Sequence, residues 1–141
     1  KVLVMGTLSR LPQSTQEYIK KAKELTKNND KIILNICLNY GGRDDITSAC
    51  KKIAEKVKNN EISLNDINEK MVNDNLMSEG LMDVDVMVRT SGEQRISNFV
   101  LWQMAYAELI FIDDYWPDFK KKQFLNILEE YTKRDRRFGG Y

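Results

Sequence analysis

The chain has 141 residues, of which 42% are hydrophobic and 30% are charged, and it contains no histidine. This composition suits one compact domain with a real core and excludes a disordered or low-complexity chain. The balance of 22 Lys and Arg against 21 Asp and Glu removes the bulk electrostatic argument for nucleic-acid binding. The lack of histidine excludes His-based triads, zinc–His sites and His general bases.

Four short apolar runs predict β-strands, at residues 2–5, 32–38, 84–88 and 109–112. Their β-branched and aliphatic residues alternate little with polar ones, which indicates parallel strands buried on both faces. The first run follows Lys1 at once, with no initial methionine. Such a start is what we expect of a domain cut from something longer.

Helical periods lie between and after these runs. One predicted apolar face carries Tyr18, Ala22 and Leu25, and a second carries Ile46, Cys50, Ile53 and Val57. Residues 99–109 are apolar nearly all round, which predicts a buried helix. A final amphipathic helix is expected from the positions of Phe124, Ile127, Leu128 and Tyr131.

Ser63 and Asp66 have the spacing of a capping box ahead of a further polar helix. Strands that alternate with helices predict an α/β fold, with an open parallel, Rossmann-like sheet and helices on both faces. Ligands of such sheets bind beyond the carboxyl ends of the strands.

The two cysteines, Cys37 and Cys50, match no metal-ligand spacing and form no disulfide framework. Both lie among apolar residues, so we expect reduced core cysteines and a cytoplasmic protein. No apolar run is long enough to span a membrane, and no signal peptide is visible.

Glycine-containing turns follow the second and third strand runs, at residues 39–45 and 89–98. Each turn places backbone N–H groups at the carboxyl edge of the sheet, a geometry that favours anions. Five of the seven arginines lie within three residues of a glycine, whereas no lysine does; the five are Arg43, Arg89, Arg95, Arg136 and Arg137. Because arginine binds phosphate oxygens with a planar fork, this distribution suggests a phosphorylated ligand.

Structural alternatives remain open for these residues. A Gly-Gly-Arg turn can be an ordinary tight turn, and Arg89 or Arg95 can be an ion-pair partner of Glu93. Glu108 ends a long apolar segment, so its carboxylate needs a partner. That partner is either an arginine or a hard cation such as Mg²⁺.

The motifs together closely resemble those of the cis-prenyltransferases, nearest to the undecaprenyl diphosphate synthase branch. The resemblance rests on RTSGEQRISNF at 89–99, LWQ at 101–103, AYAEL at 105–109, NYGGR at 39–43, WPDF at 116–119 and RRFGG at 136–140. These blocks stand in family order and cover essentially the whole chain.

The resemblance implies cis-prenyl chain elongation, in which isopentenyl diphosphate condenses repeatedly with an allylic diphosphate such as farnesyl diphosphate. By motif match, Arg89, Arg95, Ser97, Arg137 and Gly139 would bind isopentenyl diphosphate. Asn39, Arg43 and Glu93 would be catalytic, with a positional role for Glu93, and Glu108 would contribute to a Mg²⁺ site. The tail with Arg137 and Gly139 implies a homodimer, because in the family this tail reaches into the partner's site. The lipid product implies peripheral contact with a membrane surface.

The sequence departs from the family pattern in two places. Thr7 stands where family members often have Asp, and the Asp-Gly-Asn-Gly-Arg-Trp phosphate loop is absent. We therefore expect residues 1–141 to be the C-terminal part of a single domain, truncated at its N-terminal side and inactive alone. The alternative is a non-catalytic subunit that supplies its Arg-x-Gly tail to a catalytic partner, but such subunits tend to lose the arginines retained here. A generic nucleotide-binding module would need a Gly-rich phosphate loop, which the sequence lacks.

Overall fold

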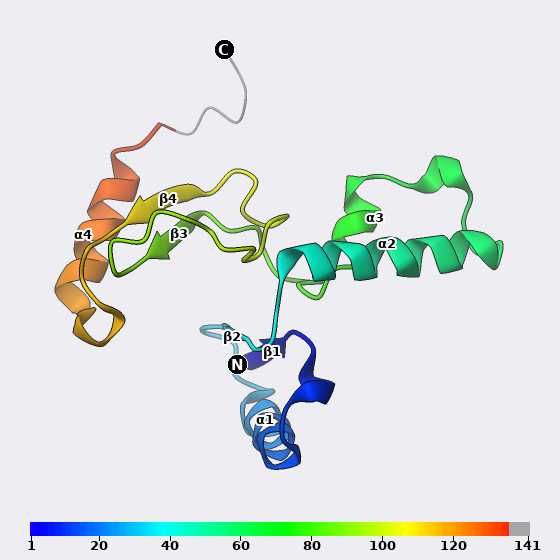
Figure 1. The fold of residues 1–141 in the computed structure, drawn as a ribbon, viewed down its shortest axis with the longest axis horizontal. Helices are drawn as coiled ribbons and strands as arrows, with labels where there is room; N and C mark the ends of the chain where they lie inside the picture. Colours follow the sequence, from blue (N-terminus) through cyan, green and yellow to red (C-terminus); the bar gives the residue numbers. More distant parts are fainter. Residues whose placement is uncertain (136–141) are drawn as a thin grey trace. The chain divides into compact units, whose positions relative to one another are not determined.

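The computed structural model describes residues 1–135, and the chain divides into two compact units, Lys1–Leu81 and Met82–Tyr141 (Figure 1). The first unit contains β1 (Val2–Met5), a 3-10 helix (Leu8–Arg10), α1 (Gln13–Thr26), β2 (Leu34–Cys37), α2 (Gly42–Lys58), a 3-10 helix (Leu64–Asp66) and α3 (Glu69–Asn73). The second contains β3 (Val86–Arg89), β4 (Glu108–Phe111), a 3-10 helix (Trp116–Asp118) and α4 (Lys121–Thr132).

Strands β1 and β2 form a parallel pair in the first unit, in register from Val2 opposite Leu34 to Met5 opposite Cys37. Helix α1 is the crossover between them, as parallel pairing requires. The N–H of Val2 donates to Oγ1 of Thr26 at 2.9 Å, which ties the start of β1 to the last residue of α1.

The buried side of α1 differs from the predicted one. Tyr18 and Leu25 are both 73% exposed, so the prediction that they pack inward is wrong. Ala22, the third residue of the predicted face, is half-buried, and Ile19 and Thr26 are half-buried with it. Tyr18 and Ile19 are neighbours in sequence and point about 100° apart on a helix, so a choice between them rotates the whole face.

Helix α2 is 17 residues long, and its buried positions are Gly42, Asp45, Ala49 and Ile53. Ile53 was expected there, whereas Cys50 is exposed, so its prediction as a core residue is wrong. Cys37 is half-buried, and both thiols are free. Ala49, the residue before Cys50, is buried instead, because the buried face of α2 runs through Asp45, Ala49 and Ile53.

The predicted capping box is present at the 3-10 helix Leu64–Asp66. The N–H of Ser63 donates to Oδ2 of Asp66 at 2.7 Å, and this hydrogen bond lowers the pKa of Asp66. Helix α3 then begins after Asn68, whose side chain accepts a hydrogen bond from the N–H of Met71.

In the second unit β3 and β4 are also parallel, from Val86 opposite Glu108 to Arg89 opposite Phe111. The expected helix over residues 99–109 is wrong: residues 99–106 form bends and turns. The carbonyl of Gln103 accepts from the N–H of Val84, and the N–H of Ala107 turns back to the carbonyl of Met104. These bonds replace the continuous i to i−4 ladder of a helix, although Val100 and Met104 are buried as the apolar pattern suggested.

Helix α4 confirms the predicted final helix, with Ile127 buried at its centre, although Phe124 and Leu128 of its predicted apolar face are 50% and 41% exposed. The preceding 3-10 helix begins at Trp116 and is followed by Phe119, and the two rings stack with centroids 5.6 Å apart. These residues form part of the connection between β4 and α4.

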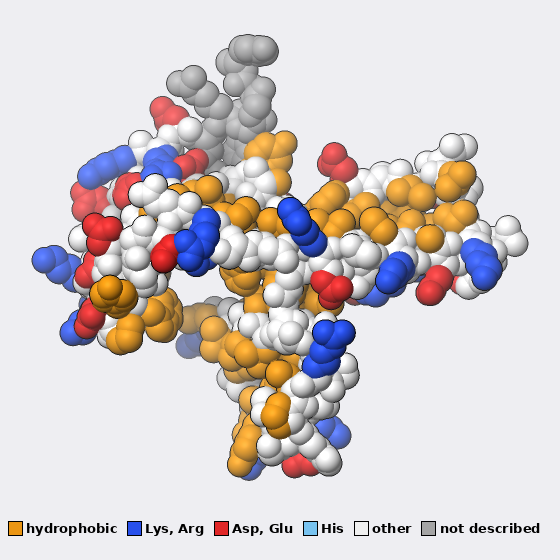
Figure 2. Space-filling view, in the orientation of Figure 1, with side chains coloured by type: hydrophobic (Ala, Val, Ile, Leu, Met, Phe, Trp, Pro, Cys, Tyr) orange, Lys and Arg blue, Asp and Glu red, His pale blue; other side chains and the backbone are white. Residues whose placement is uncertain are grey.

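The α/β class and the parallel pairing are confirmed. In the described residues, however, the strands form two separate parallel pairs, β1–β2 and β3–β4, where one open sheet was predicted. Burial on both faces is also wrong for β2, where Leu34 is 56% and Ile36 39% exposed. Figure 2 also shows hydrophobic side chains at the surface of α1, the helix on which Tyr18 and Leu25 are exposed. Within residues 1–135, no helix has both the length and the apolar character needed to cross a bilayer.

Candidate functional site

The carboxyl ends of β1 and β2 are joined by hydrogen bonds between the turns that follow them. The N–H of Thr7 donates to the carbonyl of Asn39 at 3.1 Å, and Nδ2 of Asn39 donates to the carbonyl of Thr7 at 3.0 Å. Asn39 adopts a φ of 48°, a left-handed conformation that asparagine tolerates. The backbone at Gly6 is closer still, because a Cβ there would lie 1.9 Å from the carbonyl oxygen of Leu38. These turns therefore have a fixed shape.

A polar cavity of about 230 Å³ opens at this edge, lined by Thr7, Arg10, Asn39, Tyr40, Gly41 and Asp44. Asn39 was predicted as a site residue, and its place beyond the end of β2 is as expected. Arg10 was missed. It lies a few residues beyond the end of β1, the same signal that identified Asn39 after β2. Within the described residues its guanidinium has no ion-pair partner.

A buried carboxylate supports the Asn39–Arg43 turn from behind. Asp45 is only 1% exposed, in the first turn of α2. Its Oδ2 accepts from the hydroxyl of Tyr40 at 2.9 Å, and its Oδ1 accepts from the N–H of Met77 at 2.8 Å. Arg43, the second residue of α2, is exposed. Asp45 thus links the turn that carries Asn39 and Arg43 to the segment after α3.

In the second unit, the turn after β3 is attached to the turn after β4 through its backbone. The N–H groups of Ser91 and Gly92 donate to the carbonyls of Asp114 and Ile112, both at 2.9 Å. Ser91 and Gly92 have φ values of 70° and 66°. Arg89 is the last residue of β3 and is half-buried, so its side chain starts at the carboxyl edge as predicted.

The predicted residues beyond Arg89 lie in an exposed loop. Glu93 forms an ion pair with Arg95, and the Glu93 and Arg95 side chains are 42% and 59% exposed. Ser97 has a φ of 46° and is exposed. No hydrogen bond or ion pair among residues 1–135 joins the Arg89 side chain to Arg95 or Ser97. The structure therefore brings Glu93 and Arg95 together and leaves Arg89 separate from them.

Glu108 lies at the other end of the same sheet. It is the first residue of β4 and is opposite Val86, three residues before Arg89 on β3. Three residues of strand correspond to about 10 Å. The sequence carried this signal, because Glu108 directly precedes the predicted strand at 109–112 and so falls at the amino end of a parallel strand.

Glu108 has an arginine partner. Nη1 of Arg134 lies 2.7 Å from its Oε2, and the same guanidinium pairs with Glu130. Hydrogen bonds to Glu108 and then to Glu130 raise the pKa of Arg134. Of the two partners considered for Glu108, the arginine is the one present.

The described residues do not form a metal site. Within residues 1–135, no group of three or more Cys, Asp or Glu residues is placed to hold an ion. Glu108 is a single carboxylate whose Oε2 is engaged by Arg134, so it does not by itself fit the oxygen-rich shell that Mg²⁺ prefers. Arg137 and Gly139 lie outside the described residues.

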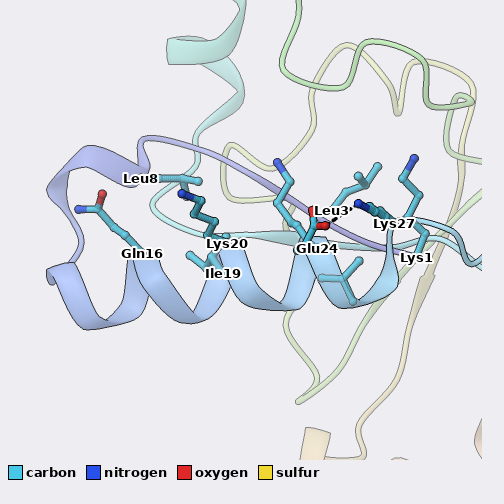
Figure 3. Close-up of a pocket in the computed structure, with 10 residues that line it drawn as sticks. Lys1, Leu3, Leu8, Gln16, Ile19, Lys20, Glu24 and Lys27 are labelled. Atoms are coloured by element: carbon cyan, nitrogen blue, oxygen red, sulfur yellow. Dashed lines mark hydrogen bonds and ion pairs between the residues drawn. The ribbon is translucent and has the colours of Figure 1, made fainter.

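The larger cavities on the described residues contain none of the predicted site residues. One of about 470 Å³ lies between α1 and β1, with Leu3, Leu8 and Ile19 on its walls and lysines around it (Figure 3). Figure 3 also shows the ion pair between Glu24 and Lys27 beside it. Another of about 440 Å³ is apolar and lies on α2, with Ile53, Val57 and Leu64 among its lining residues. Cavity size alone would thus direct attention away from the strand ends.

Comparison with known proteins gives a consistent result. Residues 1–139 match the family described as "Putative undecaprenyl diphosphate synthase". The chain is 51% identical over 137 residues to a ditrans,polycis-undecaprenyl-diphosphate synthase ((2E,6E)-farnesyl-diphosphate specific) of Haemophilus influenzae. It is 49% identical over 139 residues to an isoprenyl transferase of Bacillus subtilis. The matches cover 97% and 99% of this chain but 57% and 54% of those relatives, so the chain spans little more than half their length.

Solved structures agree. Lavandulyl diphosphate synthase from Lavandula x intermedia, crystallised with dimethylallyl diphosphate, matches with a TM-score of 0.96 and 36% identity over 99% of this chain and 60% of that one. A probable undecaprenyl diphosphate synthase of Campylobacter jejuni matches with a TM-score of 0.85 and 36% identity, over 99% of this chain and 62% of that one. With the family match over residues 1–139, these results show that the chain belongs to the cis-prenyltransferase family.

Proposed function

We propose that this chain is part of an enzyme that condenses isopentenyl diphosphate with an allylic diphosphate to build a polyprenyl diphosphate. The observation that carries the proposal is the second-unit loop, where Arg89 ends β3 and Arg95 is paired with Glu93. An arginine at a strand end and another in the loop that follows the strand suit a ligand with several phosphate oxygens. Names of relatives support farnesyl diphosphate as the allylic substrate.

In this proposal the arginines bind the diphosphate of isopentenyl diphosphate, and Glu93 positions Arg95. Arg89, Arg95 and Ser97 bind the diphosphate of isopentenyl diphosphate, with Arg137 and Gly139 contributing from the C-terminal segment. Arg95 is already held by Glu93, so less side-chain freedom is lost when the diphosphate binds. The Glu93–Arg95 pair is exposed, so the guanidinium remains accessible to substrate.

Asn39 and Arg43 serve the allylic substrate in the proposal. When the allylic carbon–oxygen bond breaks, negative charge develops on the departing diphosphate, and a placed guanidinium stabilises it. The new carbon–carbon bond forms at the same allylic carbon, and a proton is lost from the isopentenyl unit. Asn39 is fixed by its hydrogen bonds to Thr7, so it is suited to orientation.

Mg²⁺ is the proposed cofactor, with Glu108 as one contributor. Within residues 1–135, no group of three or more Cys, Asp or Glu residues is placed to hold the ion, so it would need oxygens from elsewhere, including substrate diphosphate. A homodimer and peripheral contact with a membrane through the lipid product complete the proposal.

The proposal is tested on the complete protein that contains this sequence, by incorporation of radiolabelled isopentenyl diphosphate with farnesyl diphosphate and Mg²⁺. Arg95→Ala should raise the KM for isopentenyl diphosphate by about 100-fold, since one charge-assisted pair is lost. Lys21→Ala, on the exposed side of α1, is the matched control and should leave the KM unchanged.

The same assay separates the alternatives. Residues 1–141 alone should give no turnover, and measurable elongation by them would contradict that expectation. A complete protein that elongates only after a second, different chain is added would instead establish the non-catalytic partner role. No incorporation under either condition would refute the proposed function.

A further inference from the structure

The cavity of about 470 Å³ between α1 and β1 has an apolar floor. The floor consists of four half-buried residues: Val2, Leu3, Leu8 and Ile19. The volume lies within the range of ligand-binding pockets, which is about 300–1,000 Å³. An aliphatic chain that lies along this floor would remove apolar surface from water, which is favourable.

Lysines surround the apolar floor. This basic rim consists of Lys1, Lys20, Lys23 and Lys27. Figure 3 shows Lys20 beside Leu8 and places Lys1 and Lys27 toward the other end of the cavity. Glu24 is the carboxylate among the lining residues, and it is paired with Lys27. Four lysines and one glutamate give the lining a net positive charge, so the rim favours an anion.

Most of the basic rim is available to a ligand. Among residues 1–135, the ammonium groups of Lys1, Lys20 and Lys23 have no ion-pair partner. By contrast, Lys70 and Lys133 each pair with a carboxylate four residues away. An anionic group at the rim can therefore contact three ammonium groups without displacing a carboxylate from them.

Hydrogen bonds hold the two walls of the cavity together at one end. The N–H of Val2 donates to Oγ1 of Thr26 at 2.9 Å, and that hydroxyl donates to the carbonyl of Ala22 at 2.8 Å. The N–H of Leu34 donates to the carbonyl of Lys1 at 2.9 Å, so the backbone of this rim residue is also held. The cavity is thus formed before a ligand enters, which reduces the ordering cost of binding.

The arrangement of charge and apolar surface indicates the class of ligand. A small inorganic anion would contact the rim and leave the floor in water, and an uncharged lipid would leave the ammonium groups without a partner. A molecule with both parts uses the whole cavity. We propose that the cavity between α1 and β1 binds a single amphiphilic molecule, with a phosphate head among the rim lysines and an aliphatic chain on the apolar floor. The cavity shares no residue with the proposed substrate-binding sites, so this proposal is independent of the proposed function.

The test is isothermal titration calorimetry of the complete protein with dodecyl phosphate, below the concentration at which it forms micelles. We expect saturable binding. Octyl phosphate should bind at least about tenfold more weakly, because four fewer methylene groups are buried on the floor. Dodecyl maltoside, which has an uncharged head, and inorganic phosphate, which has no chain, should also each bind at least about tenfold more weakly.

Charge reversal at the rim locates the binding. The double variant Lys20→Glu/Lys23→Glu should raise the Kd for dodecyl phosphate by at least about tenfold, because two attractive charges become repulsive. Both side chains are exposed, so the substitutions leave the core intact. The control is Lys21→Glu/Lys51→Glu, which changes the net charge equally at exposed residues of the first unit outside the cavity. Its Kd should equal that of the parent.

Each departure from these results would overturn the proposal. No binding of dodecyl phosphate would do so directly, even if vesicles of phosphatidylglycerol bind, since that pattern would indicate a bilayer surface. Equal affinity for dodecyl maltoside would show that the lysines play no part, and equal affinity for inorganic phosphate would show that the floor plays none. Equal Kd values for the two double variants would place the binding elsewhere. A complete protein without prenyltransferase activity would refute only the proposed function.

Discussion

The loops after β2 and β3 carry most of the predicted site, and the two units hold them in different ways. In the first unit one side chain, Asp45, is almost fully buried and supports the Asn39–Arg43 turn through Tyr40 and Met77. In the second unit backbone bonds at Ser91 and Gly92 hold the loop, while its charged side chains are exposed. The first arrangement concentrates stability in a few atoms. In the second arrangement the charged side chains lie at the surface, and the hydrogen bonds that hold the loop are made by the main chain.

The largest expected effect is at Gly6, which tests how tightly the first-unit edge is built. Gly6→Ala should destabilise the complete protein by about 4 kcal/mol, because φ is +123° and the new Cβ would overlap the carbonyl of Leu38. Urea unfolding measures the loss. A variant as stable as the parent would mean that the backbone at Gly6 and Leu38 relaxes readily to accommodate a Cβ.

Asp45→Ala should cost about 3 kcal/mol of unfolding free energy, since the Met77 N–H and the Tyr40 hydroxyl lose a shared buried acceptor. Asp44→Ala is the control, being the exposed carboxylate of the same helix turn. Equal losses for the two variants would show that burial of Asp45 is not what supports this turn.

In the second unit, Gly92→Ala should cost only about 1 kcal/mol. Its φ is +66°, but the nearest atom to a new Cβ is Oδ1 of Asp113 at 3.3 Å, the end of a side chain that can move. Gly80→Ala, at φ +77° with nothing within 4 Å, should behave alike. A Gly92 variant as unstable as Gly6→Ala would remove the difference between the two loops.

The smallest effect concerns Cys37, at the end of β2. Burial, and then the charge of Asp45, raise the pKa of this thiol. Alkylation of Cys37 in a Cys50→Ser background should therefore need a higher pH than an ordinary thiol, and Asp45→Asn should lower that pH. Because the pKa of Cys37 is raised in the folded state, its contribution to the free energy of unfolding is present below the ordinary thiol pKa. That contribution is lost as the pH rises through the raised pKa of Cys37. An alkylation profile identical to that of unfolded protein would contradict the assignment.

The sequence predicted what local pattern and motif determine. The core of each strand run, the capping box at Ser63, the final helix and the strand-end positions of Asn39 and Arg89 all depend on nearby residues. It failed where tertiary contacts choose between neighbours. Tyr18 and Ile19 both fit a helical period, and only the packing of α1 on β1 leaves Ile19 half-buried and Tyr18 exposed.

The prediction of a buried helix at residues 99–109 failed for a related reason. An apolar run can be a helix or a set of buried turns, and periodicity does not distinguish them. Likewise, the partner of Glu108 is 26 residues away, on the far side of α4 in sequence. Arg10 could have been found, because it follows a strand end as Asn39 does.

The parallel register also has a consequence for the order of folding. Val2 pairs with Leu34 and Val86 with Glu108, so the first pair closes the longer stretch of chain. Closure entropy grows only logarithmically with length, and the difference is less than about 0.5 kcal/mol. The entropic cost of closing the β1–β2 pair is therefore nearly the same as that of closing the β3–β4 pair. During synthesis from the amino end, every residue of the β1–β2 pair is made before Val86.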